Sequence, residues 1–366
     1  MRPWRNRPTI LLTALLALFA VIPAQAGPYV LLDVSNGRVL AGKDVHQRWY
    51  PASLTKLMTA YVAFRAVDTG TFQLNSPVVI SQKAAREPPS KMGYPAGSVL
   101  ALDDALKIIL VRSANDVATA IAESIGGSED AFAALMNAEA RRLGMSGSHF
   151  VNAHGLHSPS QYTTARDLAL LVRAIRAEFP QYAGYFSIEG LRHGKSVLRN
   201  TNHLVGRFDG ADGMKTGYIC ASGFNLVATA TRGRRTLAAI VLGARSQVER
   251  TELAAELLAQ GFKSSGFSTP RLASLRPSPS ATQAAIDMRS EICSAEAVAA
   301  RAKLRDNDGR FILNSPHVRE MTREPRLAAV GLVTTAPVAA RASGAARVPI
   351  PTPRPEYRGT AAQPGR

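Results

Sequence analysis

Strand-like segments occur at both ends of residues 27–263, and helical periodicity fills the region between them. YVLLDV and RVLAG flank Ser35-Asn36-Gly37, a turn sequence typical of a β-hairpin. FNLVATA and TLAAIVLG flank the polar run 232–235 and predict a second hairpin, which an amphipathic helix in VERTELAAELLAQGF follows. We expect the terminal strands to pair in one antiparallel sheet covered by helices, an α+β arrangement in a single domain.

The middle of this region predicts five helices from the spacing of its apolar residues. They are expected at residues 53–67, 102–111, 114–124, 129–143 and 164–177.

Residues 1–26 have the pattern of a secretory signal peptide. Arg2, Arg5 and Arg7 precede an apolar run at residues 10–22, and an Ala-Gln-Ala cleavage site ends at Ala26. The alternative is a retained membrane anchor, but the apolar run is shorter than the roughly 20 residues that span a bilayer. We therefore expect export, with the mature protein soluble or loosely associated with the envelope.

Residues 264–366 differ in composition, being rich in Pro, Ala and Arg. We expect this region to be largely disordered, with a possible helix near 284–304. The formal net charge of the chain is +17. Export and a 6% aromatic content argue against nucleic acid as a partner. Contact of the basic tail with anionic envelope polymers, or a plain preference for arginine, would explain the charge.

Ser53 and Lys56 lie three residues apart at the start of the first predicted helix. Positions i and i+3 share a helix face, so the lysine amine can reach the serine hydroxyl. A serine needs a base to act as a nucleophile, and a lysine with a lowered pKa can be that base. Only nine of the 44 basic residues are lysines. Arginine cannot lose its proton, so a lysine at position 56 indicates that deprotonation matters there.

Two further motifs follow in the chain and strengthen this interpretation. Ser113-Ala114-Asn115 begins a predicted helix, and Lys215-Thr216-Gly217 is predicted at the start of a strand. Ser113 can relay a proton to a leaving amine, and Lys215 can supply a second cation that keeps Lys56 neutral.

The remaining roles concern substrate binding. We expect Asn115 to hydrogen-bond a substrate amide and Thr216 to bind a terminal carboxylate. Gly217 allows the strand to approach the substrate closely. The backbone N–H of Tyr218, with that of Ser53, can form an oxyanion hole.

The chain resembles the low-molecular-mass penicillin-binding proteins that are D-alanyl-D-alanine carboxypeptidases, whose S-x-x-K, S-x-N and K-T-G motifs also occur in class A β-lactamases. The resemblance covers about residues 27–262. The segments that carry it are PASLTKLMTAYVA, SANDVATAIAE, GMSGSHFVNAHGL, QYTTARDLALL and DGMKTGYICASGFNLVATA.

The resemblance implies a β-lactamase/transpeptidase-like fold, with helices on both sides of the antiparallel sheet, and a D,D-peptidase catalytic domain over residues 27–263. It implies removal of the terminal D-alanine from peptidoglycan stem pentapeptides through an acyl-enzyme, with β-lactams as covalent inhibitors and no cofactor. It assigns Ser53, Lys56 and Ser113 to catalysis. It adds Arg250 as a substrate-carboxylate ligand, with a solvated helix arginine as the alternative. His154 is expected to be a packed structural residue near the cleft.

Rival functions make different demands on the sequence. A class A β-lactamase needs a deacylating Glu in E-x-x-L-N, and no glutamate between the second and third motifs has that context. A zinc peptidase needs clustered ligands, and no H-E-x-x-H occurs, so no metal is expected. A D,D-endopeptidase of the same family and a catalytically silent envelope-binding protein stay open. For Cys220 and Cys293, a disulfide and two free thiols are both open.

Overall fold

The computed structural model describes residues 27–276 and 284–333. The predicted signal peptide at residues 1–26 and the end of the predicted tail, residues 334–366, lie outside the described residues. Within the described ranges no helix is both long and apolar enough to cross a membrane.

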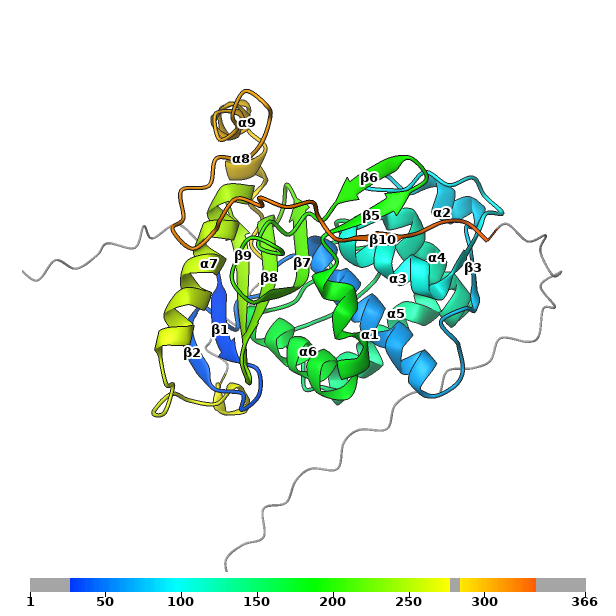
Figure 1. Cartoon of the computed structure of the whole chain (residues 1–366). Coiled ribbons are helices and arrows are strands. Elements are labelled where there is room, and N and C mark those ends of the chain that lie inside the picture. The colour runs from blue at the N-terminus through cyan, green and yellow to red at the C-terminus, as the bar shows by residue number, and fades with distance from the viewer. Residues whose placement is uncertain (1–26, 277–283, 334–366) are drawn as a thin grey trace, which may run out of the picture.

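A five-stranded sheet joins the two ends of residues 27–263, as the sequence predicts (Figure 1). Its strand order is β2-β1-β9-β8-β7, and every neighbouring pair is antiparallel. Both predicted hairpins are present, as β1–β2 and β8–β9. The strands are β1 (Tyr29–Asp33), β2 (Val39–Lys43), β7 (Ala211–Ile219), β8 (Gly223–Arg232) and β9 (Arg235–Ala244).

Helices cover both faces of this sheet, which confirms the predicted fold class. The helix α7 (Gln247–Lys263) packs on β8 and β9, and α6 (Ala165–Glu178) packs on β9 and β1 from the other side (Figure 1). Because β8 and β9 are buried along most of their length, both faces of these strands need apolar side chains. Accordingly β9 is an almost continuous apolar run, whereas β8 also buries Asn225 and Thr229.

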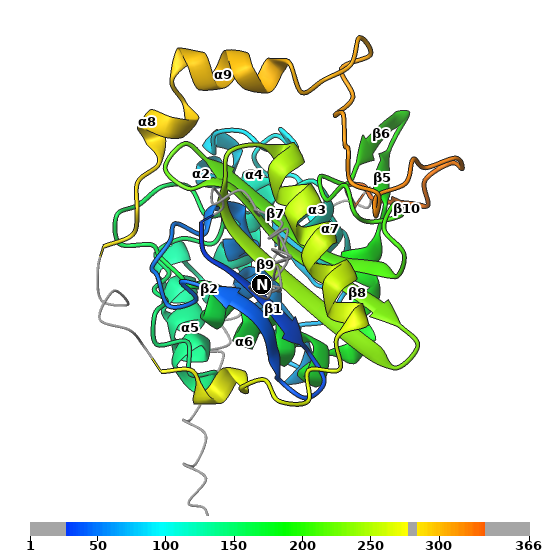
Figure 2. The same ribbon diagram turned by 90° about the vertical axis from the view of Figure 1, so that its left-hand side faces the viewer.

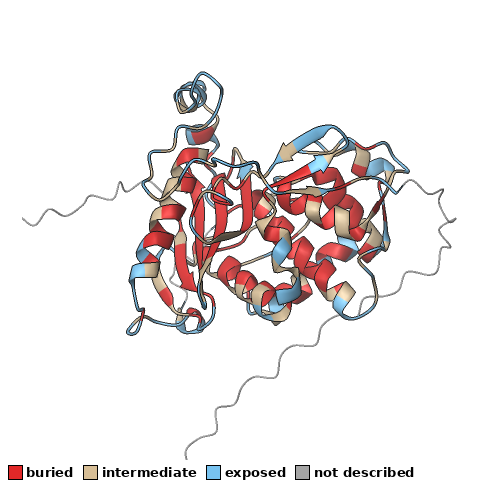
Figure 3. Ribbon diagram, viewed as in Figure 1, coloured by how far each residue is buried: buried red, intermediate tan, exposed pale blue. Residues whose placement is uncertain are grey.

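The five predicted helices are all present. The helix α1 (Thr55–Asp68) is buried over almost its whole length and lies at the centre of the helical half, where it contacts the other four (Figure 3). The side chains of Ser128 and Thr164 cap α5 and α6 by accepting a hydrogen bond from the amide three residues later. The others are α3 (Leu102–Val111), α4 (Asn115–Gly126) and α5 (Glu129–Arg142).

Several short elements were not predicted, since they are too brief to have a clear period. They are the 3₁₀ helices η1 (Ala52–Leu54), η2 (Pro180–Ser187) and η3 (Leu272–Ser274), the helix α2 (Gln82–Arg86), and the strands β3 (Pro77–Val79), β4 (Val99–Ala101), β5 (Gly190–His193) and β6 (Ser196–Arg199). The motif Lys215-Thr216-Gly217 lies in the middle of β7 and not at a strand start, because pairing with β8 already begins at Ala211.

Residues 284–333, which we call the C-terminal strap, are ordered where the composition predicts disorder. The expected helix at 284–304 is two short helices, α8 (Arg289–Ile292) and α9 (Ala295–Ala302). They are separated by Cys293, which forms a disulfide with Cys220, and Ser294 caps α9. Figure 2 shows both helices above the sheet, with the strap continuing beyond them.

The far end of the strap is fixed by a buried carboxylate. Glu189, whose side chain is fully buried, accepts hydrogen bonds from Arg323 and Arg326. These bonds hold the pKa of Glu189 at about 2, since they favour the charged carboxylate. The strand β10 (Leu327–Ala329) then pairs in parallel with β5. The composition of this segment predicted disorder because it indicates no hydrophobic core. A disulfide and an arginine–carboxylate cluster can replace such a core for a short segment.

We predict that the double variant Cys220→Ser/Cys293→Ser unfolds at a lower urea concentration than the oxidised wild type. The bridge closes a loop with a sequence separation of 73 residues, and the chain-entropy model gives such a loop up to about 4 kcal/mol. Dithiothreitol should lower the midpoint of the wild type to that of the variant and leave the variant unchanged. Equal midpoints for the oxidised wild type and the variant would contradict this.

Candidate active site

Ser53 lies on a tight turn that leads into α1. Ala52 has a φ of 48°, and the amide of Leu54 donates to the Pro51 carbonyl at 3.2 Å. Two glycines make this turn possible. A Cβ on Gly155 would lie 1.9 Å from the Ala52 oxygen, and a Cβ on Gly217 would lie 2.9 Å from the Pro51 oxygen. The serine turn is therefore held between the backbones of two segments distant in the sequence.

Lys56 is completely buried, and its amine meets three oxygen atoms. Nζ lies 3.1 Å from Ser53 Oγ, 2.8 Å from Asn115 Oδ1 and 2.6 Å from the His154 carbonyl oxygen. The predicted contact between Ser53 and Lys56 is thus present. Thr55, the first residue of α1, follows the 3₁₀ turn directly, so Ser53 precedes the α-helix rather than starting it.

The surroundings of Lys56 favour the loss of its proton. Burial lowers its pKa well below the ordinary value of 10.5, and the nearby positive charge of Lys215 lowers it further. The carboxylates of Asp116 and Glu87 oppose this shift. A neutral amine at hydrogen-bond distance from Ser53 is able to accept the hydroxyl proton, so the geometry and the electrostatics both suit a general base.

Ser113 and Asn115 reach the site from the start of α4. Ser113 has a φ of 66°, and Ala114 is the N-cap residue, with no side-chain cap. The Asn115 amide is held on both sides: its oxygen accepts from Lys56, and its nitrogen donates to the Pro88 carbonyl at 2.9 Å. Asn115 therefore orients Lys56. Its binding of a substrate amide stays a prediction.

The strand β7 forms the opposite wall. Lys215 is buried, and its amine donates to the Thr216 carbonyl at 2.9 Å. Burial and the charge of Arg250 lower the pKa of Lys215 to about 7. Thr216 Oγ1 lies 2.7 Å from Thr201 Oγ1. Two hydroxyl groups and two cations thus converge at one end of the site, where an anion would be stabilised.

Arg250 is not the solvated helix arginine that the sequence left open. It is 4% exposed and reaches from α7 to the carbonyl oxygens of Gly217 and Asn225, each at 3.2 Å. Burial lowers its pKa to about 9, which keeps it charged at neutral pH. Within the described residues its Nε has no hydrogen-bond partner. Arg250 therefore brings a buried positive charge to the wall of the cleft.

The predicted residues surround one cleft of about 290 Å³. Lys56 and Lys215 are buried behind its walls. Eight residues that the sequence analysis names line it: Ser53, Ser113, Asn115, His154, Thr216, Gly217, Tyr218 and Arg250. The lining residues that the sequence missed are Pro89, Ser90, Arg112, Gly155, Leu156, Thr201, Ile219, Phe224 and Gln247. The missed residues carry no motif of their own; only Thr201, through its hydroxyl contact with Thr216, has an obvious chemical role.

Gly217 lines the cleft, and its backbone also lies close to the serine turn. An added Cβ would lie 3.2 Å from the backbone nitrogen of Ser53. Tyr218 follows directly, and its ring stacks on Phe224 with centroids 4.2 Å apart. The backbone amides of Ser53 and Tyr218 therefore belong to the two segments that meet here. Their action as an oxyanion hole stays a prediction.

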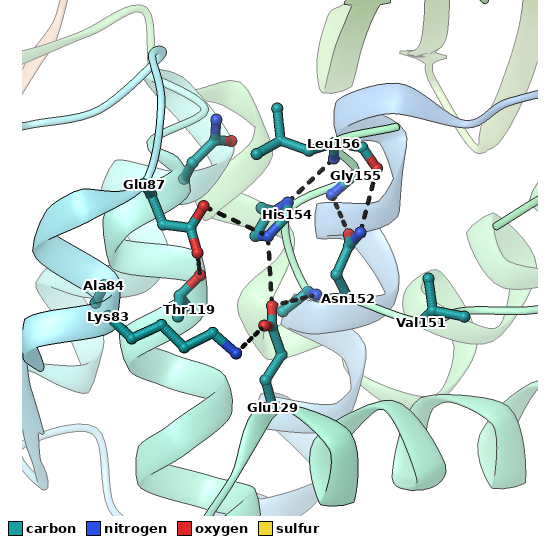
Figure 4. A network of polar contacts seen from close by, with 12 residues as sticks. Lys83, Ala84, Glu87, Thr119, Glu129, Val151, Asn152, His154, Gly155 and Leu156 are labelled. Carbon is teal, nitrogen blue, oxygen red and sulfur yellow. Dashed lines mark hydrogen bonds and ion pairs between the residues drawn. The ribbon is translucent and has the colours of Figure 1, made fainter. Parts of the chain in front are cut away.

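One group in the described part of the chain has the spacing of a metal site. Single ligand atoms of Glu87, Glu129 and His154 lie within 4.8 Å of one another. However, the Leu156 amide donates to His154 Nδ1 at 3.0 Å, so the proton of the neutral ring sits on Nε2 (Figure 4). A protonated Nε2 has no lone pair for a metal. These residues do not fit a metal ion as they stand.

A serine held by two glycines, 3.1 Å from a buried lysine amine, is the arrangement that a serine nucleophile of the S-x-x-K type would need. A family model described as D-alanyl-D-alanine carboxypeptidase matches residues 20–246. The chain belongs to this family.

Similar proteins agree with this assignment. D-alanyl-D-alanine carboxypeptidase DacD of Salmonella typhimurium is 37% identical over 243 residues, covering 64% of this chain and 62% of the relative. DacA of Escherichia coli is 36% identical, covering 65% and 61%. The structure of penicillin binding protein 6B from Escherichia coli is 37% identical with a TM-score of 0.62, covering 65% of this chain and 78% of that chain. The chain thus spans less than two thirds of the length of these curated relatives.

We predict that Gly217→Ala lowers the stability of the protein. Its Cβ would lie 2.9 Å from the Pro51 oxygen and 3.2 Å from the amide nitrogens of Ser53 and Leu54, so backbone must move. Such overpacking costs about 1–3 kcal/mol. Urea unfolding measures the loss. The control is Gly184→Ala, where an added Cβ has no atom within 4 Å. A Gly217→Ala protein as stable as this control would refute the prediction.

Proposed function

We propose that this protein is a serine-type D-alanyl-D-alanine carboxypeptidase, which removes the terminal D-alanine from peptidoglycan stem pentapeptides. The observation that carries the proposal is the contact of 3.1 Å between Ser53 Oγ and the buried amine of Lys56. Family membership and the names of the relatives support the substrate class. β-Lactams would acylate the same serine. A similar protein, penicillin-binding protein D2 from Listeria monocytogenes, has a crystal structure in an ampicillin-bound form.

In the first step, neutral Lys56 takes the proton of Ser53, and Oγ attacks the carbonyl carbon between the two D-alanines. Negative charge then develops on the carbonyl oxygen, where the amides of Ser53 and Tyr218 would donate to it. Ser113, which lines the same cleft, would pass a proton to the departing amine. The C–N bond breaks, D-alanine leaves, and the rest of the peptide stays esterified to Ser53. Water then hydrolyses the ester.

The carboxylate of the terminal D-alanine gives the cations of the cleft a role. Thr216, Lys215 and Arg250 cluster at one end of the site, and both cations are buried. A carboxylate there would be attracted by both charges and could accept hydrogen bonds from Thr216 and Arg250, which line the cleft. The cluster therefore suits a substrate with a free carboxylate beside the scissile amide, as the pentapeptide has.

Efficient β-lactamase action is less compatible with the cleft. Among the described residues that line it there is no Asp or Glu that could activate a deacylating water. The proposed site of action is the periplasm, reached through the signal peptide expected at residues 1–26. Envelope contact through the basic tail is part of the same proposal.

We predict that the mature protein removes one alanine from a stem pentapeptide and that Ser53→Ala does not. Mass spectrometry of the incubated peptide measures this, and folding of the variant is checked by its urea midpoint. Cleavage of cross-linked dimers alone would favour the endopeptidase. If the protein cleaves no peptide and penicillin does not acylate Ser53, the catalytically silent binding protein is the alternative that remains.

The two lysines predict a bell-shaped dependence of kcat/KM on pH. Activity rises with pH as Lys56 loses its proton, and falls above about pH 7 as Lys215 loses the charge that binds the carboxylate. In Lys215→Arg the charge persists, so the alkaline limb should move up by more than about one pH unit. The exposed Lys195→Arg serves as the control. An alkaline limb that is unchanged in Lys215→Arg would rule out this role for Lys215.

A further inference from the structure

Figure 4 shows a polar network of Glu87, Glu129, His154 and Lys83, and the backbone of His154 links it to the amine of Lys56. The backbone carbonyl of His154 accepts a hydrogen bond from Lys56 Nζ at 2.6 Å, and its side chain extends between two carboxylates. His154 Nε2 lies 3.4 Å from Glu129 Oε1 and 3.7 Å from Glu87 Oε2. Lys83 pairs with the other oxygen of Glu129 at 2.7 Å. The proposed mechanism uses only the backbone of His154 and none of these side chains.

The ring of His154 is neutral and has one tautomer. Burial is the largest cause that lowers its pKa to about 3, and the positive charge of Lys83 acts in the same direction. The Leu156 amide donates to Nδ1, which leaves the proton on Nε2, facing the two carboxylates. The ring is thereby oriented at both nitrogens, and the backbone of residue 154 is oriented with it.

Each carboxylate also ties the ring to another part of the fold. Glu129 Oε1, at the start of α5, accepts from the Ala153 amide at 3.3 Å, next to the carbonyl that meets Lys56. Glu87 Oε1 accepts from Thr119 Oγ1 at 3.0 Å, and Thr119 lies on α4, the helix that begins with Asn115. Two of the three oxygens around Lys56 Nζ therefore belong to segments that this network joins.

We propose that Glu87 and Glu129 are positioning residues, which hold the His154 carbonyl against Lys56 through the His154 ring and the Ala153 amide and so control the base for Ser53. The proposal rests on the proposed function in taking Lys56 as that base. Both residues act through others, since neither lines the cleft.

The charges around Lys56 give the two residues distinct effects. Lys215 on β7 favours the neutral amine, whereas Asp116 on α4 and Glu87 favour the charged amine. Glu129 is neutralised by Lys83, which also faces Glu123 and Asp130. Loss of the Glu87 charge should therefore lower the pKa of Lys56. Loss of Glu129 should chiefly make the position of the His154 carbonyl less fixed.

The test compares Glu87→Gln, Glu87→Asp and Glu129→Gln with Glu139→Gln. Glu139 is a matched control, because it lies on α5 with Glu129, is 3% exposed and pairs with Arg65 and Arg142. The readouts are kcat and KM for the pentapeptide against pH, and the pH titration of the Lys56 signal in [13Cε]lysine NMR, assigned with Lys56→Met. Urea midpoints verify folding, and elemental analysis measures bound zinc.

In Glu87→Gln the acidic limb and the Lys56 titration should both move down by about one pH unit, the effect of one nearby charge. Glu87→Asp should restore both. Glu129→Gln should lower kcat about tenfold with little change in KM, because a misplaced base slows chemistry more than binding. Glu139→Gln should alter neither profile.

Two outcomes would overturn the proposal. One is a set of folded variants in which Glu87→Gln and Glu129→Gln behave like Glu139→Gln. The other is stoichiometric zinc that these two substitutions remove. The NMR titration needs no turnover, so it decides the role of Glu87 even if the wild type cleaves no peptide. A failure of the proposed function is thus distinguished from a failure of this inference.

Discussion

The burial of one amine, Lys56 Nζ, organises this structure. A buried amine must find polar partners, since an unsatisfied one costs several kcal/mol. Its partners come from three segments: the serine turn before α1, the start of α4 and the loop at His154. A fourth segment, β7, brings the charge of Lys215 close. The need to satisfy this amine thus draws together residues from distant parts of the chain.

Much of the fold follows from the sequence, because it rests on patterns that are local. The hairpins have turn residues between apolar runs, and the five helices have apolar faces of the expected period. The joining of the terminal strands in one antiparallel sheet was predicted, and the pair that joins them is β1 with β9. Short strands such as β5 and β6 have no such pattern, and their pairing is decided by their neighbours.

The site was predictable to the extent that its residues stand in motifs. Ser53, Ser113 and Thr216 lie around one cleft as expected. The missed groups are single residues whose meaning depends on tertiary contacts. Glu87, Glu129 and His154 are too far apart in the chain to suggest a cluster, and His154 was expected to be only a packed structural residue. Its backbone oxygen, which no sequence pattern can reveal, is what contacts Lys56.

The strap has a mechanical consequence for the cleft. One wall of the cleft is β7, and the other is formed by the serine turn before α1 and the residues around the start of α4. Opening the cleft therefore requires the sheet half and the helical half to separate. The strap is bonded to the sheet half at Cys220 and ends on the helical half, where the Val333 amide donates to the Val99 carbonyl. The strap therefore connects the two walls of the cleft along the outside of the molecule. The width of the cleft is limited by the length of a peptide segment as well as by packing between its walls.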